Sequence, residues 1–286
     1  MANQDRFRYN TGMQPLAWRI IYSKALDGAW NMAVDEAILE AVGQGSSSPT
    51  LRLYAWQPPC LSLGYAQPHS DVDLAALNNS GWQIVRRPTG GRAILHTDEL
   101  TYAVIAPLHE SRVEGGILES YRRLAGALLQ ALQLLGLPAQ ADHNNHRPAD
   151  SQPNGAVCFD VPSNYEITAN GKKIIGSAQA RRLSGVLQHG SLPLCGDLTR
   201  ITRVLAFPNE NERREAATKL LEHATTLETI LKRPISWEDA ASVFKTGFEQ
   251  SLDLNLEPGH LNGIELKRAA ELVKEKYGNP EWTNRF

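Results

Sequence analysis

Apolar residues recur along this chain with two spacings, one typical of β-strands and the other of α-helices. Residues 51–56 place Leu51 and Leu53 opposite Arg52 and Tyr54, which is the alternation of a strand with one buried face. Similar short patterns predict further strands at 16–22, 60–65, 82–87 and 99–106. Asp27 can cap a helix, because its carboxylate accepts the free N–H groups of a first turn. Apolar residues then follow it at helical spacing.

The middle of the chain predicts helices followed by an antiparallel meander. Asp71 is expected to open a short helix that ends near Gly81. A long amphipathic helix is predicted from about 117 to 135, with one apolar stripe made by Ile117, Tyr121, Leu124, Leu128 and Leu132. Strands are predicted at 163–168, 172–182 and 186–194. The first two are joined at Asn170-Gly171, a pair suited to a type I′ turn.

The last third of the chain is charged and helical in pattern from Asp197 onward. Ser236 and Asp239 predict a capping box, and a short segment at 253–257 precedes a last helix from about 261 to 277. The predicted fold class is α+β: a largely antiparallel sheet with packed helices and a helical C-terminal portion. We expect a domain over 1–257, with a core at about 16–195 and a helical extension at 197–257, then a helix and tail over 258–286.

Composition and charge narrow the classes of function. The chain has 286 residues, of which 42% are hydrophobic and 21% charged, enough for a large core. A formal net charge of −2 gives no reason to expect binding to nucleic acid or to an anionic membrane. No apolar run approaches the roughly 18 residues of a membrane span, and the first residues lack the apolar stretch of a signal peptide.

Cysteine usage fits a reducing cytoplasm. The chain has three cysteines, Cys60, Cys158 and Cys195, which is too few and too irregular for a disulfide framework or a zinc site. His143 and His146 are spaced like metal ligands but lack an evident third ligand, so we expect no metal.

The stretch RRPTGGR, residues 86–92, lies between two predicted strands. Glycines without Cβ allow the backbone to approach a ligand closely, and a turn can aim several N–H groups at one oxygen. Arg86, Arg87 and Arg92 can hold a carboxylate, a phosphate or an acidic partner. The alternative is a plain hairpin turn whose arginines are solvated.

Further candidates lie in the second half of the chain. Cys158 follows the polar loop 142–157, where a partly exposed thiol can act as a nucleophile; a small buried residue is the alternative. If Ile174 faces the core, Lys173 faces the other side of its strand with Ile175 and Ser177. A solvated edge lysine is the alternative there.

The residues next to this lysine suit a ligand chain. The run Gly176-Ser177-Ala178 packs poorly in a strand but leaves a smooth surface for an extended ligand. His189, in the stretch QHGSL, can donate to a ligand or be a satisfied histidine at the end of a strand.

Taken in order, these stretches resemble the lipoate–protein ligase, octanoyltransferase and biotin–protein ligase superfamily. The resemblance covers roughly residues 16–257 and is carried by WNMAVDEAIL, WQPPCLSLGYAQ, RRPTGGRAILHTDELTY, VCFDVPSNYE, NGKKIIGSAQ and VLQHGSLPL. Arg92 stands where the ATP-using ligases of the superfamily have a third glycine, and those ligases lack a cysteine in the position of Cys158. In both respects, and in the tail YGNPEWTNRF, the chain is similar to LipM-type octanoyltransferases.

The resemblance implies a catalytic domain of the kind shared with class II tRNA synthetases. It implies transfer of an octanoyl group from octanoyl-acyl carrier protein, through a thioester on Cys158, to a lysine of a lipoyl domain such as the glycine-cleavage H protein. Lys173 would be the second catalytic residue, and no cofactor is implied. The implied substrate-binding residues are Arg86, Arg87, Thr89, Gly90, Gly91, Arg92, His96, Gly176, Ser177, Ala178, His189 and Gly190. We also expect the arginines to meet the acidic partner proteins.

The Cys158–Lys173 pair sets a geometric condition. A turn at Asn170-Gly171 places Thr168 opposite Lys173, so the strand from 163 runs roughly 17 Å away from the lysine at about 3.3 Å per residue. The thiol and the lysine therefore meet only if the 142–158 loop closes over the site. Three other functions stay open at this point: an ATP-dependent lipoate ligase, an amidotransferase between lipoyl domains, and a lipoyl-domain binding module without catalysis.

Overall fold

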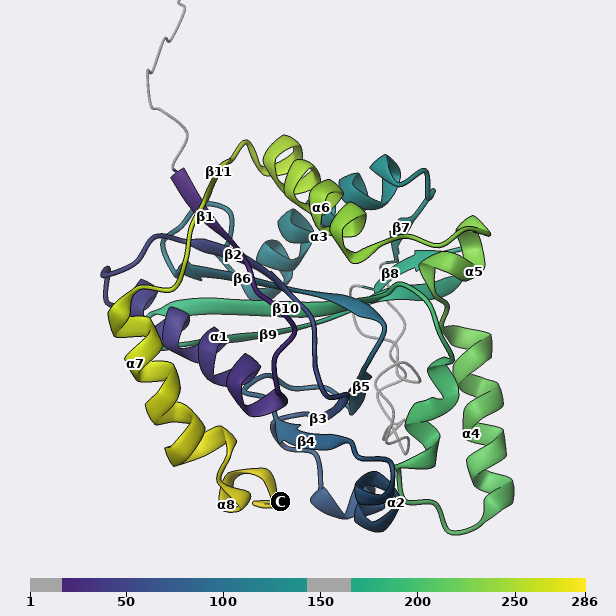
Figure 1. Cartoon of the computed structure of the whole chain (residues 1–286). Helices are drawn as coiled ribbons and strands as arrows, with labels where there is room; N and C mark the ends of the chain where they lie inside the picture. Colours follow the sequence, from purple (N-terminus) through teal and green to yellow (C-terminus); the bar gives the residue numbers. More distant parts are fainter. Residues whose placement is uncertain (1–16, 143–165) are drawn as a thin grey trace, which may run out of the picture.

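The computed structural model describes residues 17–142 and 166–286, which are organised by two β-sheets (Figure 1). The larger sheet has eight strands in the order β11-β1-β2-β6-β10-β9-β8-β7. Its strands are β1 (Ala17–Tyr22), β2 (Thr50–Tyr54), β6 (Glu99–Pro107), β7 (Gln140–Asp142), β8 (Glu166–Ala169), β9 (Lys172–Arg182), β10 (Gly185–Pro193) and β11 (Asn255–Pro258). Pairing is antiparallel from β2 to β7 and parallel only where β1 meets β2 and β11. The predicted largely antiparallel α+β fold is confirmed.

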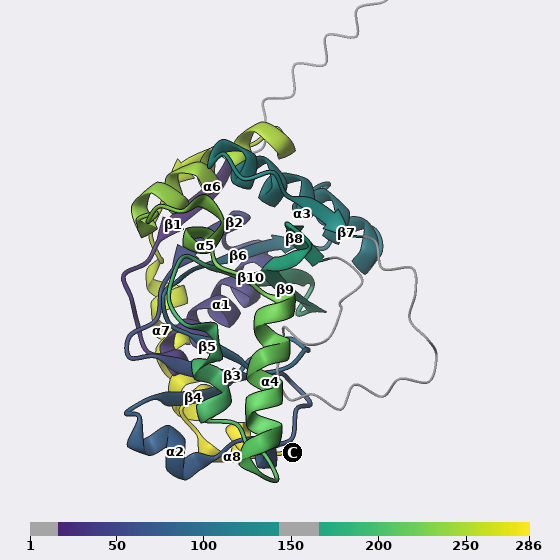
Figure 2. The same cartoon turned by 90° about the vertical axis from the view of Figure 1, so that its right-hand side faces the viewer.

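Helices cover both faces of this sheet. Helices α3 (Ile117–Leu134) and α6 (Trp237–Leu252) lie on one face, and α1 (Gly28–Gly43) and α7 (Gly263–Leu272) lie on the other (Figures 1 and 2). The first face buries Leu128 and Phe244 against Tyr102, and the second buries Ile38 against Ala103. Each fully buried Leu, Ile or Phe contributes about 1.5–3 kcal/mol, so the two apolar layers fix the sheet between its helices.

The smaller sheet has three strands in the order β4-β3-β5. Its strand pairing shows that the RRPTGGR stretch makes a different connection from the predicted hairpin. Its strands are β3 (Cys60–Leu63), β4 (Gln83–Arg86) and β5 (Ile94–His96). β4 pairs in parallel with β3, β5 pairs antiparallel with β3, and β6 belongs to the other sheet. The stretch therefore does not close a hairpin. It leads from one edge strand to the other, a connection that the sequence could not reveal because β5 was not predicted.

Short helices pack around the smaller sheet and lead back to the larger one. They are η1 (His69–Asp71), α2 (Leu74–Asn79), η3 (Leu198–Arg203), α4 (Glu210–His223) and α5 (Leu227–Leu231). Asp73, not Asp71, caps α2, and its side chain accepts the Ala76 N–H. Asp71 instead ends the preceding 3-10 turn. At α6, Ser236 accepts the Asp239 N–H, which is one of the two bonds of the predicted capping box.

The predicted meander is confirmed, with one correction. Asn170 and Gly171 have φ values of 52° and 73°, as a type I′ turn requires, and Thr168 lies opposite Lys173. Ile174 and Ile175, however, are both buried in the main core rather than on opposite faces. The pairing register shifts between Ile167 and Thr168, and such an irregularity breaks the strict alternation of a strand.

The remaining differences lie at the ends of helices. The buried stripe of α3 includes Leu124, Leu128 and Leu132 as predicted, but Ile117 at its start is 53% exposed. The last helix continues from α7 into a π-helical turn, η4 (Val273–Tyr277), followed by α8 (Pro280–Thr283). α7 and η4 pack along α1, and α8 packs on β4. No helix in the described parts of the chain is long and apolar enough to cross a membrane.

Candidate active site

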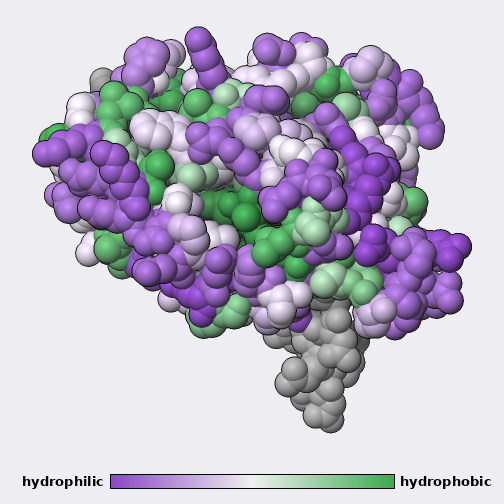
Figure 3. All heavy atoms as spheres, turned by 60° about the horizontal axis from the view of Figure 1, so that its bottom comes forward, coloured by the Kyte–Doolittle hydropathy of each residue, from purple (hydrophilic) through white to green (hydrophobic). Residues whose placement is uncertain are grey.

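A cavity of about 760 Å³ opens between the RRPTGGR loop and strands β9 and β10. This volume is typical of small-molecule sites in proteins. Its apolar wall includes Met32, Tyr54, Trp56 and Ile94, and Tyr65 lies at its edge. Seen from below the view of Figure 1, apolar side chains gather in a hollow that polar side chains surround (Figure 3). The cavity can therefore take a ligand with an apolar chain and a polar end.

The cavity brings together most of the site residues expected from the sequence. Those in its wall are Arg87, Thr89, Gly90, Gly91, Arg92, His96, Lys173, Gly176, Ser177, Ala178, His189 and Gly190. Gly176, Ser177 and Ala178 of β9 pair with Ser191, Gly190 and His189 of β10, so two strands supply one small-residue wall. Cys158 lies outside the described residues, and so does the segment expected to close over the site.

Arg86 is the exception, and its expected role in substrate binding is wrong. Its side chain is fully buried and is not in the cavity wall. The guanidinium donates to the carbonyl oxygens of Thr283, Gly64, Tyr65 and Gln67 at 2.6–3.2 Å. A cation with no exposed surface in this structure cannot meet a partner protein. Arg86 instead ties the C-terminal turn to the edge of the cavity.

Arg87 lines the cavity but also serves the loop itself. It is only 3% exposed and donates to the carbonyl oxygens of Gly90, Arg92 and Ser62. The loop is also held from β3, because the Tyr65 N–H donates to the Thr89 carbonyl at 2.8 Å. A Cβ on Gly64 would lie 1.8 Å from the Gly91 carbonyl oxygen, and Gly91 itself has a φ of 93°. Both positions therefore require glycine for the loop to lie on β3.

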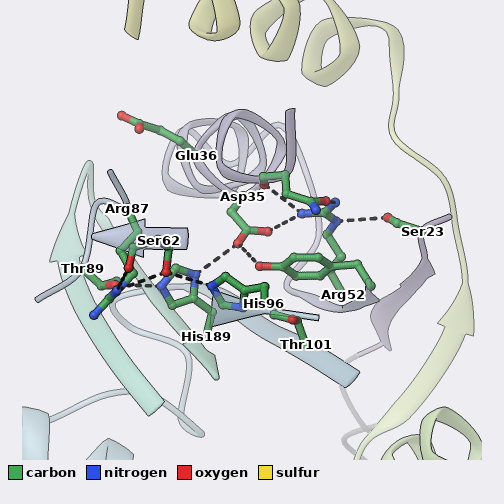
Figure 4. A network of polar contacts seen from close by, with 12 residues as sticks. Ser23, Asp35, Glu36, Arg52, Ser62, Arg87, Thr89, His96, Thr101 and His189 are labelled. Atoms are coloured by element: carbon green, nitrogen blue, oxygen red, sulfur yellow. Dashed lines mark hydrogen bonds and ion pairs between the residues drawn. The ribbon is translucent and has the colours of Figure 1, made fainter. Parts of the chain in front are cut away.

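A chain of hydrogen bonds runs from helix α1 through His189 to this loop (Figure 4). Asp35 Oδ2 lies 3.3 Å from Nδ1 of His189, and His189 Nε2 lies 2.7 Å from Thr89 Oγ1. Burial lowers the pKa of His189, and Asp35 only partly offsets this, so the imidazole is neutral at pH 7. The carboxylate accepts from Nδ1–H, and Nε2 therefore accepts from the Thr89 hydroxyl.

Asp35 is fixed by a fully buried ion pair. Arg52 Nη1 lies 2.7 Å from Asp35 Oδ1, neither side chain is exposed, and Arg52 also donates to Asn31 and Ser23. The Tyr54 hydroxyl donates to Asp35 at 2.9 Å. Burial alone would raise the pKa of Asp35, but Arg52 and His189 outweigh it and leave that pKa lowered. The carboxylate is thus ionised and keeps His189 in one tautomer.

A second carboxylate–imidazole–hydroxyl chain lies close to the first (Figure 4). Glu99 Oε1 lies 2.7 Å from Nδ1 of His96, and His96 Nε2 lies 2.8 Å from Ser62 Oγ. Arg87 donates to the same Ser62 hydroxyl at 3.2 Å. Trp56 stacks on the His96 ring with 4.0 Å between centroids. Two polar chains therefore hold the glycine-rich loop, one through Thr89 and the other through Arg87 (Figure 4).

Lys173 reaches the cavity from the start of β9. Its Nζ donates to Glu166 Oε1 of β8 at 2.8 Å, and the side chain is 3% exposed. The Thr225 N–H donates to the Lys173 carbonyl at 3.1 Å, so the link between α4 and α5 runs beside it. Lys173 is therefore a held, buried cation in the wall and not a solvated lysine at a strand edge.

Among the described residues that line the cavity, four are cationic and none is Asp or Glu. The cations are Arg87, Arg92, Lys173 and Arg182. The sequence reasoning missed Arg182 and Ser62 in the wall, and also Asp35 and Glu99 behind it. Asp35 left a signal, because it is an acidic residue within the apolar pattern of WNMAVDEAIL. Ser62 and Glu99 lie in ordinary strand patterns, and nothing in the sequence marks them as site residues.

Comparison with known proteins places this site in a family. A model of the lipoyl protein ligase A/B catalytic domain matches residues 27–249. The chain belongs to this family. It is 41% identical to octanoyltransferase LipM of Symbiobacterium thermophilum over 271 residues, covering 94% of this chain and 98% of that protein. It is 38% identical to octanoyltransferase LipM of Brevibacillus brevis, covering 94% and 99%.

Solved structures of the family share its architecture. A bipartite lipoate protein ligase of Thermoplasma acidophilum matches with a TM-score of 0.77 at 24% identity, covering 94% of this chain and 96% of that one. Lipoate-protein ligase A bound with ATP matches with a TM-score of 0.75 at 26% identity, covering 94% and 98%. Within the parts of this chain that the structure describes, no three His, Cys, Asp or Glu side chains gather as a metal site would require.

Proposed function

We propose that this protein transfers an octanoyl group from octanoyl-acyl carrier protein to a lysine of a lipoyl-domain protein, in lipoate biosynthesis. The proposal is supported by the full-length similarity to octanoyltransferases. The observation that carries it in the structure is Lys173 in the wall of one cavity with the glycine-rich loop and the small-residue strands. The glycine-cleavage H protein is the acceptor that we propose.

The reaction would proceed in two acyl transfers. The Cys158 thiolate attacks the thioester carbonyl of the donor, the carrier thiol leaves, and a thioester forms on Cys158. The neutral amine of the acceptor lysine then attacks that thioester, the Cys158 thiolate leaves, and an amide forms. Neither transfer needs ATP, because the donor is already a thioester.

The described residues would serve these steps from the walls. Gly176, Ser177 and Ala178 leave room for the acyl chain along β9. The Gly90 and Gly91 backbone lies at the cavity, where N–H groups can stabilise the oxyanion of each tetrahedral intermediate. The Lys173–Glu166 pair would take the proton that the acceptor amine loses: Lys173 would pass one of its protons to the Glu166 carboxylate, 2.8 Å from its Nζ, as it accepts the new one.

One incubation tests the proposal. The enzyme is mixed with octanoyl-acyl carrier protein and apo H protein without nucleotide, and the intact masses of all three proteins are followed. We expect an octanoyl adduct first on the enzyme and then on the H protein. In the Cys158→Ala variant both adducts should be missing, whereas Cys60→Ala should keep them, because Cys60 is buried in the core.

The same assay separates the alternatives. A ligase would need free octanoate and ATP and would release pyrophosphate. An amidotransferase would move the group from one modified lipoyl domain to another. Transfer that requires ATP, or an acyl adduct that survives in Cys158→Ala, would contradict the proposal.

A further inference from the structure

A group of cations lies next to the cavity, built by β9 and the 276–286 segment. We name it the cationic corner: Arg182, Lys276 and Arg285, with the rings of Tyr65 and Trp282. Arg182 lines the cavity, and so does Tyr65, which is 41% exposed. The 276–286 segment lies beside β4 in both Figure 1 and Figure 2. The corner therefore borders the entrance from the side of the smaller sheet.

Arg285 is held in place by aromatic rings and not by a carboxylate. Its guanidinium carbon lies 3.7 Å from the Trp282 ring centre and 4.0 Å from that of Tyr65. One Nη2 hydrogen bond, to the Tyr65 carbonyl at 3.4 Å, is its only polar contact among the described residues. Trp282 is itself fixed, because its indole N–H donates to the Arg86 carbonyl at 2.8 Å. A stacked guanidinium keeps its charge and most of its donors for an anion.

Part of the positive charge of the corner is not paired. Glu36 meets both Arg182 at 2.9 Å and Lys276 at 2.6 Å. Arg285 has no ion pair within the described residues, and Glu281 of the same segment is exposed. The whole chain has a formal net charge of −2, so this unpaired cation is a local feature.

The cations are close enough to affect one another. Behind the corner, burial lowers the pKa of the Arg86 guanidinium, and the neighbouring Arg285 and Arg87 lower it further. Burial also lowers the pKa of Lys276; Glu36 opposes this effect, and Arg182 and Arg285 add to it. Charges that repel across one surface are relieved when an anionic partner binds there.

We infer that the cationic corner is the docking surface for the acidic carrier protein that delivers the octanoyl thioester. This inference rests on the proposed function. Charge complementarity selects an acidic partner, and the position of Tyr65 in both the corner and the cavity wall connects the surface to the site.

The position of Lys173 favours the donor over the acceptor. The Thr225 N–H, in the link between α4 and α5, donates to the Lys173 carbonyl, and α5 lies away from α8 in both Figure 1 and Figure 2. A carrier holds its acyl group on a long flexible arm, so its body can dock at a distance from the reacting atoms. An acceptor lysine has only its own side chain and must bring its domain close to the acyl group.

The experiment compares two donors in three enzymes. Octanoyl-acyl carrier protein and octanoyl-pantetheine, which carries the same thioester without protein, are assayed with wild type, Arg285→Glu and Arg233→Glu. Arg233 is an exposed arginine just after α5. Arg233→Glu therefore makes the same change of charge as Arg285→Glu at a position away from the corner. We expect Arg285→Glu to raise KM for the carrier donor by about tenfold or more. KM for octanoyl-pantetheine and for the acceptor should stay unchanged, and Arg233→Glu should resemble wild type.

Each other outcome overturns the inference in a distinct way. An unchanged KM for the carrier would show that the corner does not dock it. A raised KM for the acceptor would assign the corner to the lipoyl domain. An equal rise in KM with both donors would mean that Arg285 only shapes the cavity. Arg285→Gln checks this outcome, because it keeps a planar group without the charge. A wild-type enzyme that accepts octanoate from neither donor would refute the proposed function itself.

Discussion

Removing the charge of Asp35 should destabilise the protein far more than removing the charge of a surface aspartate. Asp35 is fully buried, pairs with Arg52 at 2.7 Å, and also accepts from Tyr54 and His189. In Asp35→Asn the shape is kept but Arg52 becomes a buried cation without a counter-ion. Breaking a buried pair from one side costs about 3–5 kcal/mol. The amide oxygen keeps one acceptor, so we expect the lower value, about 3 kcal/mol.

Thermal unfolding measures this effect. For a chain of this size 1 kcal/mol shifts Tm by about 2–4 °C, so Asp35→Asn should lower Tm by about 6–12 °C. The matched control is Asp98→Asn. Asp98 also pairs with an arginine, Arg200, but its side chain is 43% exposed. An exposed pair contributes at most about 1 kcal/mol, so the control should lose no more than a few degrees.

The pH dependence gives a second check with a defined sign. Burial raises the pKa of Asp35, but Arg52 and His189 outweigh it, so the folded pKa is lower than the unfolded value of about 3.9. The stability that Asp35 contributes is therefore present above about pH 4 and is lost as the pH falls through the folded pKa. Asn cannot titrate, so the difference in Tm between wild type and Asp35→Asn should narrow toward pH 3. Equal losses in the two variants, or a difference that does not change with pH, would refute this account.

Three further predictions concern the cavity. Lys173→Ala should lower the rate of octanoyl transfer about a hundredfold or more. Lys172→Ala is the control, because the neighbouring Lys172 donates to a backbone carbonyl, and it should not lower the rate. Equal rates in the two variants would exclude Lys173 from the chemistry. Gly176→Val should block the acyl chain and abolish turnover with little change in Tm, and full activity would mean that the chain lies elsewhere. Thr89→Val removes the hydroxyl that bonds His189 at 2.7 Å and should cost about 1 kcal/mol of stability, measured by urea unfolding, while Thr89→Ser should restore it.

Local signals in the sequence were enough to predict the elements that depend on near neighbours. The type I′ turn at Asn170-Gly171, the cap at Asp27 and the placement of Thr168 opposite Lys173 all follow from residues a few positions apart, and all three are confirmed. The similarity to one superfamily also named twelve of the residues in the cavity wall. These features are readable because turn geometry, capping and strand register depend on near neighbours.

The contacts between these residues depend on the folding of distant segments onto one another. Thr89 meets His189 across 100 positions, and His189 meets Asp35 across 154, so no spacing in the sequence could pair them. RRPTGGR looked like a hairpin with solvated arginines or a ligand loop, and both readings gave Arg86 an exposed charge. The chain instead returns at Thr283 to cover Arg86 with backbone carbonyls. A buried cation needs such partners, and they come from a segment almost two hundred residues away, which only the folded chain brings within reach.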